Sequence, residues 1–343
     1  MSEKLLEVKN LVVNFKMRSG EVTAINDVSF SLLKGEKFGL VGESGAGKSV
    51  TGFSIIKLIS KPGYIKSGEI LFKNNDLVKL DYESVRKIRG NRISMIFQDP
   101  MMTLNPVLTI GTQMMETLIA HKNISKSEAR KIAVEKLKKV HIPSPEKRLE
   151  QYPHEFSGGM RQRIIIAISL LTDPELIIAD EPTTALDVTI QAEIMELLLQ
   201  LCDSMGMGLI LITHDLAVVS QVTDRMAVMY AGKIIEEGNT LEIIENPKHP
   251  YTEGLIAALP ESASTKEKLN QIPGNMPGLG KIPEGCSFHP RCTKMMDICL
   301  TEVPELKEYK KLHRKISCHL YNEKEQSNAE NPFIGSERSI QAF

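Results

Sequence analysis

The glycine-rich run near residue 45 holds the residue types that bind phosphate. Its sequence, Gly42-Glu43-Ser44-Gly45-Ala46-Gly47-Lys48-Ser49, fits the pattern G-x-x-x-x-G-K-[ST]. Glycines let several backbone N–H groups point at one phosphate chain, while the lysine reaches the β- and γ-phosphates and the serine hydroxyl reaches Mg²⁺. The pattern predicts a nucleotide-phosphate site and leaves ATPases, GTPases and kinases open. The residues expected there are Gly42, Ser44, Gly45, Ala46, Gly47, Lys48, Ser49 and Val50.

A pair of carboxylates follows an apolar run further along the chain. The run Leu176-Ile177-Ile178-Ala179 ends in Asp180 and Glu181. In a protein with such a phosphate loop, an aspartate at the end of a strand holds Mg²⁺ directly or through water. The next carboxylate is then placed to polarise a water in line with the γ-phosphate. An ordinary charged strand end is the other interpretation, and the loop upstream favours the catalytic one.

Strands that alternate with helices must bring these two segments together. A buried strand is predicted before the loop, at 37–41, and a helix after it, at 48–59. Alternation of this kind favours a parallel α/β sheet. The other expected elements are short β-runs within 5–33 and 65–75, strands at 92–97, 176–179 and 208–213, a hairpin at 227–237, helical stretches within 107–150, and helices at 160–171 and 190–205.

Composition places the chain among ordinary globular proteins. Its 343 residues are 42% apolar and 25% charged, which excludes collagenous and low-complexity chains. The formal net charge of -1 argues against a protein that coats nucleic acid. The longest apolar run, 164–171, is shorter than the about 18 residues that a membrane span needs. The first residues show no apolar stretch typical of a signal peptide.

The segment Ser157-Gly158-Gly159-Met160-Arg161-Gln162 lies between the loop and the acidic strand. Together with those two motifs it resembles the signature motif of ABC-type ATPases, and the resemblance covers residues 5 to about 255. It implies an α/β P-loop NTPase fold of the ABC type, with a RecA-like core, an antiparallel β-subdomain and a helical subdomain at about 99–163. Ser157, Gly158 and Gly159 form a Gly-Gly turn at a helix N-terminus, which can bind a second phosphate. The resemblance implies that two chains enclose ATP head to tail at this turn.

Further residues resemble the landmarks of that family. The resemblance implies that Glu181 is the general base, that His214 contacts the γ-phosphate, and that Gln98 senses Mg²⁺ and links the site to the helical insert. It also implies that Phe15 stacks on adenine, with Phe30 and Phe38 nearby in the sequence, and that Ala185-Leu186-Asp187 cross the dimer interface. Phe156 and Met160 depart from the usual Leu and Gln of the signature. Met160 cannot donate a side-chain hydrogen bond to the opposite ribose.

The choice between ABC proteins depends on what the chain lacks and on three short runs. It has no long heptad run, as DNA-organising members have, and only one phosphate loop, unlike ribosome-acting members. The runs 98–106, 249–252 and 285–292 resemble the peptide and nickel importer branch. That resemblance implies a peripheral ATPase at the cytoplasmic face of the membrane. Its expected partners are a second ATPase subunit, two permease subunits and an external solute-binding protein, with no nucleic acid; a homodimer and a nickel importer stay open.

Four cysteines gather near the C-terminus, while Cys202 stands in an apolar helix and is expected to be core. Intervals of five, six and eighteen residues separate Cys286, Cys292, Cys299 and Cys318. Four thiolates suit Zn²⁺ or an iron–sulfur cluster, and the spacing decides between neither. Plain thiols, or zinc with His289, His313 or His319, stay open. Resemblance to peptide-importer ATPases adds that this extension houses a [4Fe-4S] cluster in some relatives.

A change of texture near residue 260 predicts how the chain is divided. Residues 1–259 are expected to form the ATPase domain and 260–322 a small cysteine-rich C-terminal domain. Residues 323–343 are polar and are expected to be a disordered tail. The transported substrate is not readable, because the ATPase does not touch it.

Overall fold

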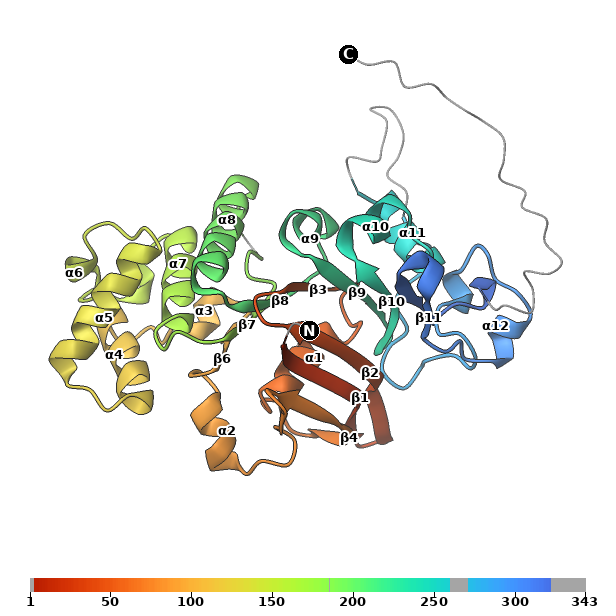
Figure 1. Cartoon of the computed structure of the whole chain (residues 1–343), viewed down its shortest axis with the longest axis horizontal. Helices are drawn as coiled ribbons and strands as arrows, with labels where there is room; N and C mark the ends of the chain where they lie inside the picture. The colour runs from red at the N-terminus through yellow and green to blue at the C-terminus, as the bar shows by residue number, and fades with distance from the viewer. Residues whose placement is uncertain (1–2, 185, 260–270, 322–343) are drawn as a thin grey trace, which may run out of the picture.

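A mixed sheet of eight strands forms the centre of the computed structural model, which describes residues 3–184, 186–259 and 271–321 (Figure 1). Its inner strands are parallel, because they are short apolar runs buried on both faces. The parallel sheet predicted from the alternating pattern is confirmed. In sheet order the strands are β11 (Lys307–Tyr309), β12 (Arg314–Ile316), β10 (Lys233–Asn239), β9 (Arg225–Tyr230), β3 (Lys37–Val41), β8 (Gly208–Thr213), β7 (Leu176–Asp180) and β6 (Ile93–Ile96).

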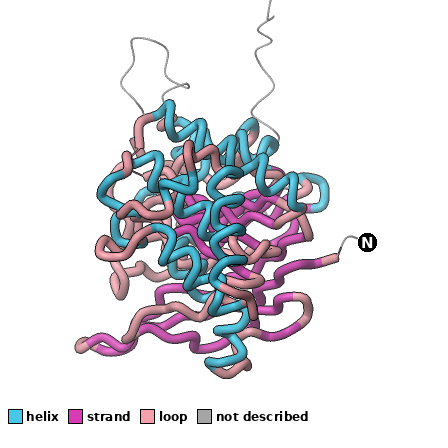
Figure 2. The backbone as a smooth tube through the Cα atoms, turned by 90° about the vertical axis from the view of Figure 1, so that its left-hand side faces the viewer, coloured by secondary structure: helices cyan, strands magenta, loops and turns pink. Residues whose placement is uncertain are grey.

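Successive residues of the central strands serve two different cores. Ile177 and Leu211 belong to one buried cluster, while Ile178 and Ile210 belong to the other. This follows from the two-residue period of a strand, which points neighbouring side chains to opposite faces. Figure 2 shows the strands between helices on one side and a second group of strands on the other. The phosphate loop and the acidic pair lie in the layer between these cores.

A four-stranded antiparallel sheet covers one face of the central sheet. Its order is β2-β1-β4-β5, and β1 pairs with both β2 and β4. Phe30 of this sheet and Phe38 of β3 are buried and stack at 5.1 Å between ring centroids. The resemblance implied this β-subdomain. Its strands are β1 (Lys4–Met17), β2 (Gly20–Leu33), β4 (Gly63–Phe72) and β5 (Asn75–Asp76).

A group of helices extends from the β6 edge, as the helical stretch in the sequence predicts (Figure 1). The helix Lys126–Lys139 begins with a capping box, in which Ser125 and Glu128 each accept an N–H of the other's backbone. Leu118, Leu137 and Ile164 are buried where this group packs on the signature helix, α7 (Gly158–Ser169), which begins with the signature segment. Its elements are α3 (Pro100–Thr103), α4 (Ile110–His121), α5 (Lys126–Lys139), α6 (Pro145–Arg148) and the 3₁₀ turn η1 (Pro153–Glu155).

The remaining helices pack on the central sheet. The signature helix begins after Ser157, whose side chain accepts the N–H of Met160, as an N-cap does. No helix in the described ranges is long and apolar enough to cross a membrane. The helices are α1 (Lys48–Ile55), α2 (Tyr82–Ile88), α7 (Gly158–Ser169), α8 (Val188–Met205), α9 (Leu216–Val222), α10 (Thr240–Glu245) and α11 (Pro250–Ala257).

The C-terminal region adds two short strands to the far edge of the central sheet. β12 pairs with β10, and β11 pairs with β12. Buried Arg314 of β12 donates to Glu236 of β10, which is wholly buried. The strands of this region therefore belong to the same sheet as strands that precede residue 259. The predicted domain boundary between residues 259 and 260 stays a prediction. Its other elements are η3 (His289–Arg291), α12 (Ile298–Thr301), η4 (Lys310–Leu312) and η5 (His319–Tyr321). Residues 260–270 and the predicted tail at 323–343 lie outside the described residues.

Candidate functional site

The phosphate loop joins β3 to α1, between the strand and the helix that the motif requires. Gly42 has a φ of 155°, and a Cβ there would lie 2.4 Å from the carbonyl oxygen of Met229. Gly47 has a φ of 106° and directly precedes α1. Only glycine meets both demands without strain. The loop therefore turns its backbone toward the N-terminus of α1, where N–H groups can bind an anion.

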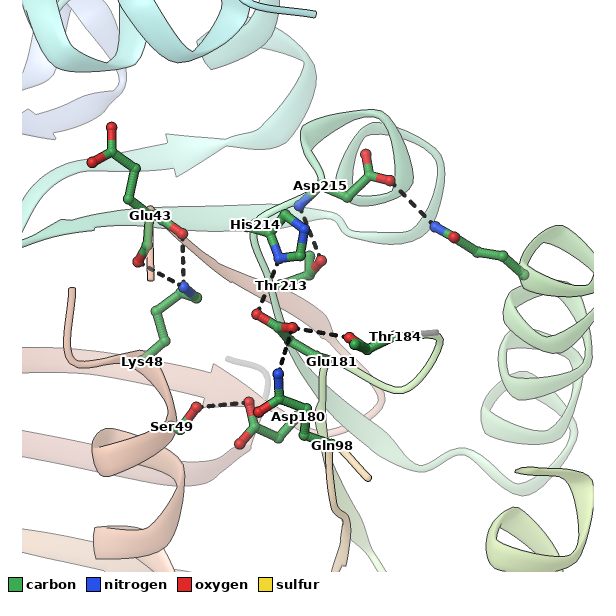
Figure 3. A network of polar contacts seen from close by, with 12 residues as sticks. Glu43, Lys48, Ser49, Gln98, Asp180, Glu181, Thr184, Thr213, His214 and Asp215 are labelled. Carbon is green, nitrogen blue, oxygen red and sulfur yellow. Dashed lines mark hydrogen bonds and ion pairs between the residues drawn. The ribbon is translucent and has the colours of Figure 1, made fainter. Parts of the chain in front are cut away.

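Lys48, the first residue of α1, lies back along the loop. Its Nζ donates to the carbonyl oxygens of Gly42 at 2.7 Å and Glu43 at 3.0 Å (Figure 3). The side chain is buried, and this burial lowers the pKa of Lys48 although neighbouring carboxylates oppose the shift. A buried cation whose hydrogen bonds, within the described residues, go to two backbone carbonyls is a favourable site for a phosphate.

Asp180 and Ser49 meet beside Lys48. The hydroxyl of Ser49 donates to Oδ1 of Asp180 at 3.0 Å, and the carboxylate is only 2% exposed. Burial raises the pKa of Asp180 to about 6. A hydroxyl and a buried carboxylate are the hard oxygen ligands that Mg²⁺ prefers, so these residues fit the predicted ion.

Glu181 follows at the very end of β7 and gathers three polar side chains. Its Oε2 accepts from Nε2 of Gln98 and from Oγ1 of Thr184, both at 2.9 Å. Its Oε1 lies 3.0 Å from Nδ1 of His214 (Figure 3). Burial raises the pKa of Glu181, but the hydrogen bonds from His214 and Thr184 outweigh it, and the pKa lies below its usual value. The carboxylate is therefore ionised at neutral pH.

The backbone at Glu181 is unusual for a residue with a side chain. Its φ is 44°, in the left-handed region that few such residues adopt. Its N–H donates to the carbonyl oxygen of Ile212 in β8 at 2.8 Å, which holds the turn in place. Strained conformations of this kind gather at functional sites. The turn directs the carboxylate toward Gln98 and His214, which come from the ends of β6 and β8.

The signature turn lies apart from this polar network. Ser157 caps the N-terminus of α7, which begins with Gly158 and Gly159, and Figure 3 labels none of these three residues in the polar network. Gly159 lies close to α8, because a Cβ there would be 2.9 Å from Cγ2 of Ile190. The two phosphate-binding surfaces predicted in one chain therefore lie at the N-termini of two different helices, α1 and α7.

Of the predicted aromatic residues, Phe15 is the one that is not fully buried. It lies on β1, paired with Val22, and its ring is packed against Gly63. Phe30 and Phe38 are core residues. Leu186 and Asp187 directly precede α8, and Ala185 lies outside the described residues. The adenine-stacking role of Phe15 stays a prediction.

The four C-terminal cysteines lie near one another. The N–H of Cys286 donates to the carbonyl oxygen of Cys299 at 2.9 Å. Burial raises the pKa of Cys318 to about 12, and the charges of the other three thiols add to this shift. No group of three or more His, Cys, Asp or Glu in the described ranges is arranged to hold a metal ion. The cluster predicted from the resemblance therefore stays a prediction, and Cys202 is buried in the core as expected.

Two groups of polar contacts at the site were not predicted from the sequence: that of Thr184 with Glu181, and those of Arg291 and Tyr251 with Glu43. Thr184 is three residues beyond Glu181, and a hydroxyl so close to a catalytic acid is a signal that could have found it. Arg291 and Tyr251 both contact Glu43 of the phosphate loop. No local pattern could have found these contacts, because they join residues more than 200 positions apart.

Family models match both parts of the chain. The model described as "ABC transporter" matches residues 25–184, and the one described as "Oligopeptide/dipeptide transporter, C-terminal region" matches residues 235–299. The oligopeptide transport ATP-binding protein OppD of Bacillus subtilis is 53% identical over 88% of this chain and 85% of its own length. The dipeptide transport ATP-binding protein DppD of the same organism is 53% identical over 87% of this chain and 89% of its own.

Solved structures agree with these matches. A dimeric ATP-binding cassette in a post-hydrolysis state, bound to ADP and Pi, superposes with a TM-score of 0.62 at 30% identity. The match covers 68% of this chain and 98% of the other. The cbiO1 protein of Clostridium perfringens, part of an ABC transporter complex, gives a TM-score of 0.61 at 28% identity, over 71% of this chain and 92% of its own. The chain belongs to the family of ABC transporter ATP-binding proteins. Within it, the chain carries the C-terminal region of the oligopeptide and dipeptide type.

Proposed function

We propose that this chain is the ATP-hydrolysing motor subunit of an importer for dipeptides or oligopeptides. The observation that carries the proposal is the carboxylate of Glu181, held by Gln98, Thr184 and His214 beside the Ser49–Asp180 pair and Lys48. This arrangement provides a base, a cation and a phosphate loop at one end of the sheet. The peptide class comes from the relatives, which are named as oligopeptide and dipeptide transport ATP-binding proteins.

The loop and Lys48 bind the phosphates. In their presence the Nζ of Lys48 exchanges its contacts with the Gly42 and Glu43 carbonyls for the β- and γ-phosphate oxygens. Ser49, Asp180 and Gln98 would supply oxygen ligands for Mg²⁺, which would neutralise phosphate charge. Phe15 gives the adenine ring an apolar face.

Glu181 orients the attacking water and accepts its proton. Its lowered pKa keeps the carboxylate ionised, so that it can accept a hydrogen bond from the water. His214 holds the same carboxylate and lies where it can donate to the γ-phosphate oxygens. Because Gln98 follows β6 and precedes α3, its contact with Glu181 links the site to the helical group.

The signature turn serves the nucleotide of a second chain. Ser157, Gly158 and Gly159 stand at the start of α7, whereas Lys48 begins α1, and a solved cassette with this fold is a dimer bound to ADP and Pi. Two chains arranged head to tail would place this turn over the partner's phosphates. We infer a dimer with a second ATPase subunit, or with another copy of this chain in isolation.

The assembly needs partners that cross the membrane. We infer two permease subunits, which contact the helical group at about 99–163, and an external binding protein that selects the peptide. The motor would be attached peripherally, at the cytoplasmic face. The cargo never reaches the nucleotide site, so its class depends on these partners.

A [4Fe-4S] cluster at the four C-terminal cysteines is a further part of the proposal. Burial raises the pKa values of the Cys286, Cys292 and Cys318 thiols, and hydrogen bonding by the backbone N–H groups of Phe288, Lys294 and Leu320, respectively, partly offsets this rise. Hydrogen bonds of this kind stabilise thiolate ligands and tune cluster potentials. The chain would hold a cluster in a small C-terminal unit, at about 260–322, whose buried apolar residues in the described ranges are Phe288, Cys299 and Ile316.

ATP hydrolysis by Glu181→Gln tests the enzymatic half of the proposal. Gln keeps the shape of the side chain and removes the proton acceptor, so we expect MgATP binding to be kept and the hydrolysis rate to fall about 10²–10⁴-fold. Glu175→Gln is the matched control, because Glu175 directly precedes β7 and pairs with Lys73 and Arg92 away from the site. Hydrolysis at the parent rate by Glu181→Gln would refute the assignment.

A further inference from the structure

Glu43, the second residue of the phosphate loop, is bonded to the C-terminal region by its side chain. The guanidinium of Arg291 donates from Nη1 to Oε2 at 2.9 Å and from Nη2 to Oε1 at 3.0 Å. Such a two-bond contact fixes both the distance and the plane of the carboxylate. The side chain of Arg291 is 7% exposed and that of Glu43 28%, so solvent screens the pair only in part.

The backbone of Glu43 is fixed as well. Its N–H donates to the hydroxyl of Tyr251, in α11, at 2.9 Å. On the opposite side, its carbonyl oxygen accepts from Nζ of Lys48 at 3.0 Å and from the N–H of Ala46 at 3.2 Å. One residue of the loop therefore contacts Arg291 and Tyr251 as well as the phosphate-binding lysine.

Arg291 is itself held firmly. Its Nε donates to the carbonyl oxygen of Pro273 at 2.8 Å, and its guanidinium lies 5.8 Å from the ring centroid of Tyr230. The rings of Tyr230, Tyr251 and Phe288 pack edge to face, with centroids 4.8 to 5.4 Å apart. The guanidinium therefore has a fixed position before any nucleotide binds.

We propose that Arg291 is a positioning residue for the phosphate loop. Through Glu43 it holds the loop in the conformation that binds phosphate. The glycine-rich segment then loses less conformational entropy when the nucleotide binds. The inference rests on the proposed function, because the loop it positions is the one that binds ATP. The C-terminal region is then a part of the nucleotide site, contributed by residues more than 200 positions away.

Arg291 also connects the phosphate loop to the segment that carries two of the C-terminal cysteines. It lies between Cys286 and Cys292, in the 3₁₀ turn η3. The N–H of His289 donates to the carbonyl oxygen of Cys286 at 3.0 Å, and the N–H of Cys292 donates to that of His289 at 3.2 Å. The backbone that carries the two thiols therefore also sets the direction of the guanidinium.

Nucleotide affinity of full-length variants tests the proposal. MgADP binding is measured by calorimetry, and kcat and KM for MgATP by steady-state hydrolysis, for Arg291→Ala, Arg291→Lys and Glu43→Gln. Lys294→Ala is the matched control, because Lys294 lies on the same segment and pairs with Glu253 at the surface. Thermal unfolding without nucleotide is measured for each variant, so that a loss of stability is separated from a loss of affinity.

We expect Arg291→Ala and Glu43→Gln each to raise the Kd for MgADP and the KM for MgATP about tenfold, with a much smaller change in kcat. Arg291→Lys should keep part of the affinity, because lysine keeps the charge without the two-bond fork. The double variant should be no weaker than either single one, since both remove the same contact. Lys294→Ala should bind as the parent chain does.

The proposal is overturned if Arg291→Ala and Glu43→Gln bind MgADP as tightly as the parent, whether or not their unfolding temperatures fall. It is also overturned if the two effects add in the double variant. A parent chain that binds no MgADP would instead overturn the proposed function, and this inference with it.

Discussion

Glu181 shows how a single position combines strain, charge and contacts. It has a left-handed backbone, and its carboxylate lies among Gln98, Thr184 and His214. Burial raises the pKa of this carboxylate, but the hydrogen bonds from His214 and Thr184 bring it below its usual value. The preceding residue, Asp180, has different surroundings, and burial raises its pKa to about 6. Two adjacent acids therefore have different roles, one toward water and one toward a cation.

The C-terminal cysteines give a prediction at the same scale. Purified without oxygen, the chain should be brown and contain iron, and Cys318→Ser should lose both, because the variant lacks one of four thiolate ligands. Cys202→Ala is the control, because Cys202 is buried in the core on α8 and is not one of the four proposed ligands. A colourless, iron-free parent chain would rule the cluster out.

Elements with a strong hydrophobic pattern could be predicted from the sequence, and elements fixed by tertiary contacts could not. β7 and β8 are apolar runs buried at every position, and α7 has the N-cap Ser157. In contrast, β11 and β12 have three residues each and depend on tertiary pairing, β12 with the edge at β10 and β11 with β12. The site follows the same rule: contiguous motifs gave Lys48 and Glu181, while the contact of Arg291 with Glu43 depends on the fold.

The N-terminus of α11 gives a prediction about acid stability. His249 caps this helix by accepting the N–H of Tyr251 at 3.0 Å, and burial lowers its pKa to about 3. In the unfolded chain the pKa is about 6.5, so between these values the unfolded state binds more protons and stability falls as the pH falls. The contribution approaches about 1.4 kcal/mol for each pH unit below 6.5.

His249→Asn should remove this dependence while keeping a side-chain acceptor at the cap. Urea unfolding at pH 7.5, 6.5 and 5.5, values chosen to span the His titration, should show a smaller loss of stability in the variant than in the parent. His141→Asn is the control, since His141 is exposed and its φ of 58° suits asparagine. Equal pH slopes for His249→Asn and the parent would contradict the account.

At the scale of the whole molecule, one sheet connects three parts. The helical group extends from the β6 edge, the nucleotide site lies at the ends of β3, β6, β7 and β8, and the C-terminal strands complete the opposite edge (Figure 1). Gln98 joins the site to the helical group, and Glu43 joins it to the C-terminal region. A change at the phosphates can therefore reach both ends of the molecule through direct contacts, as a motor requires.

Peptide uptake by cells that lack this gene tests the central claim most directly. The cells receive the parent chain, Glu181→Gln or the control Glu175→Gln, and uptake of a labelled dipeptide, a labelled oligopeptide and labelled nickel is measured. We predict that the parent and Glu175→Gln restore peptide uptake and that Glu181→Gln, present at the same level, does not. Peptide uptake restored equally by Glu181→Gln, or restored uptake of nickel in place of peptides, would contradict the account.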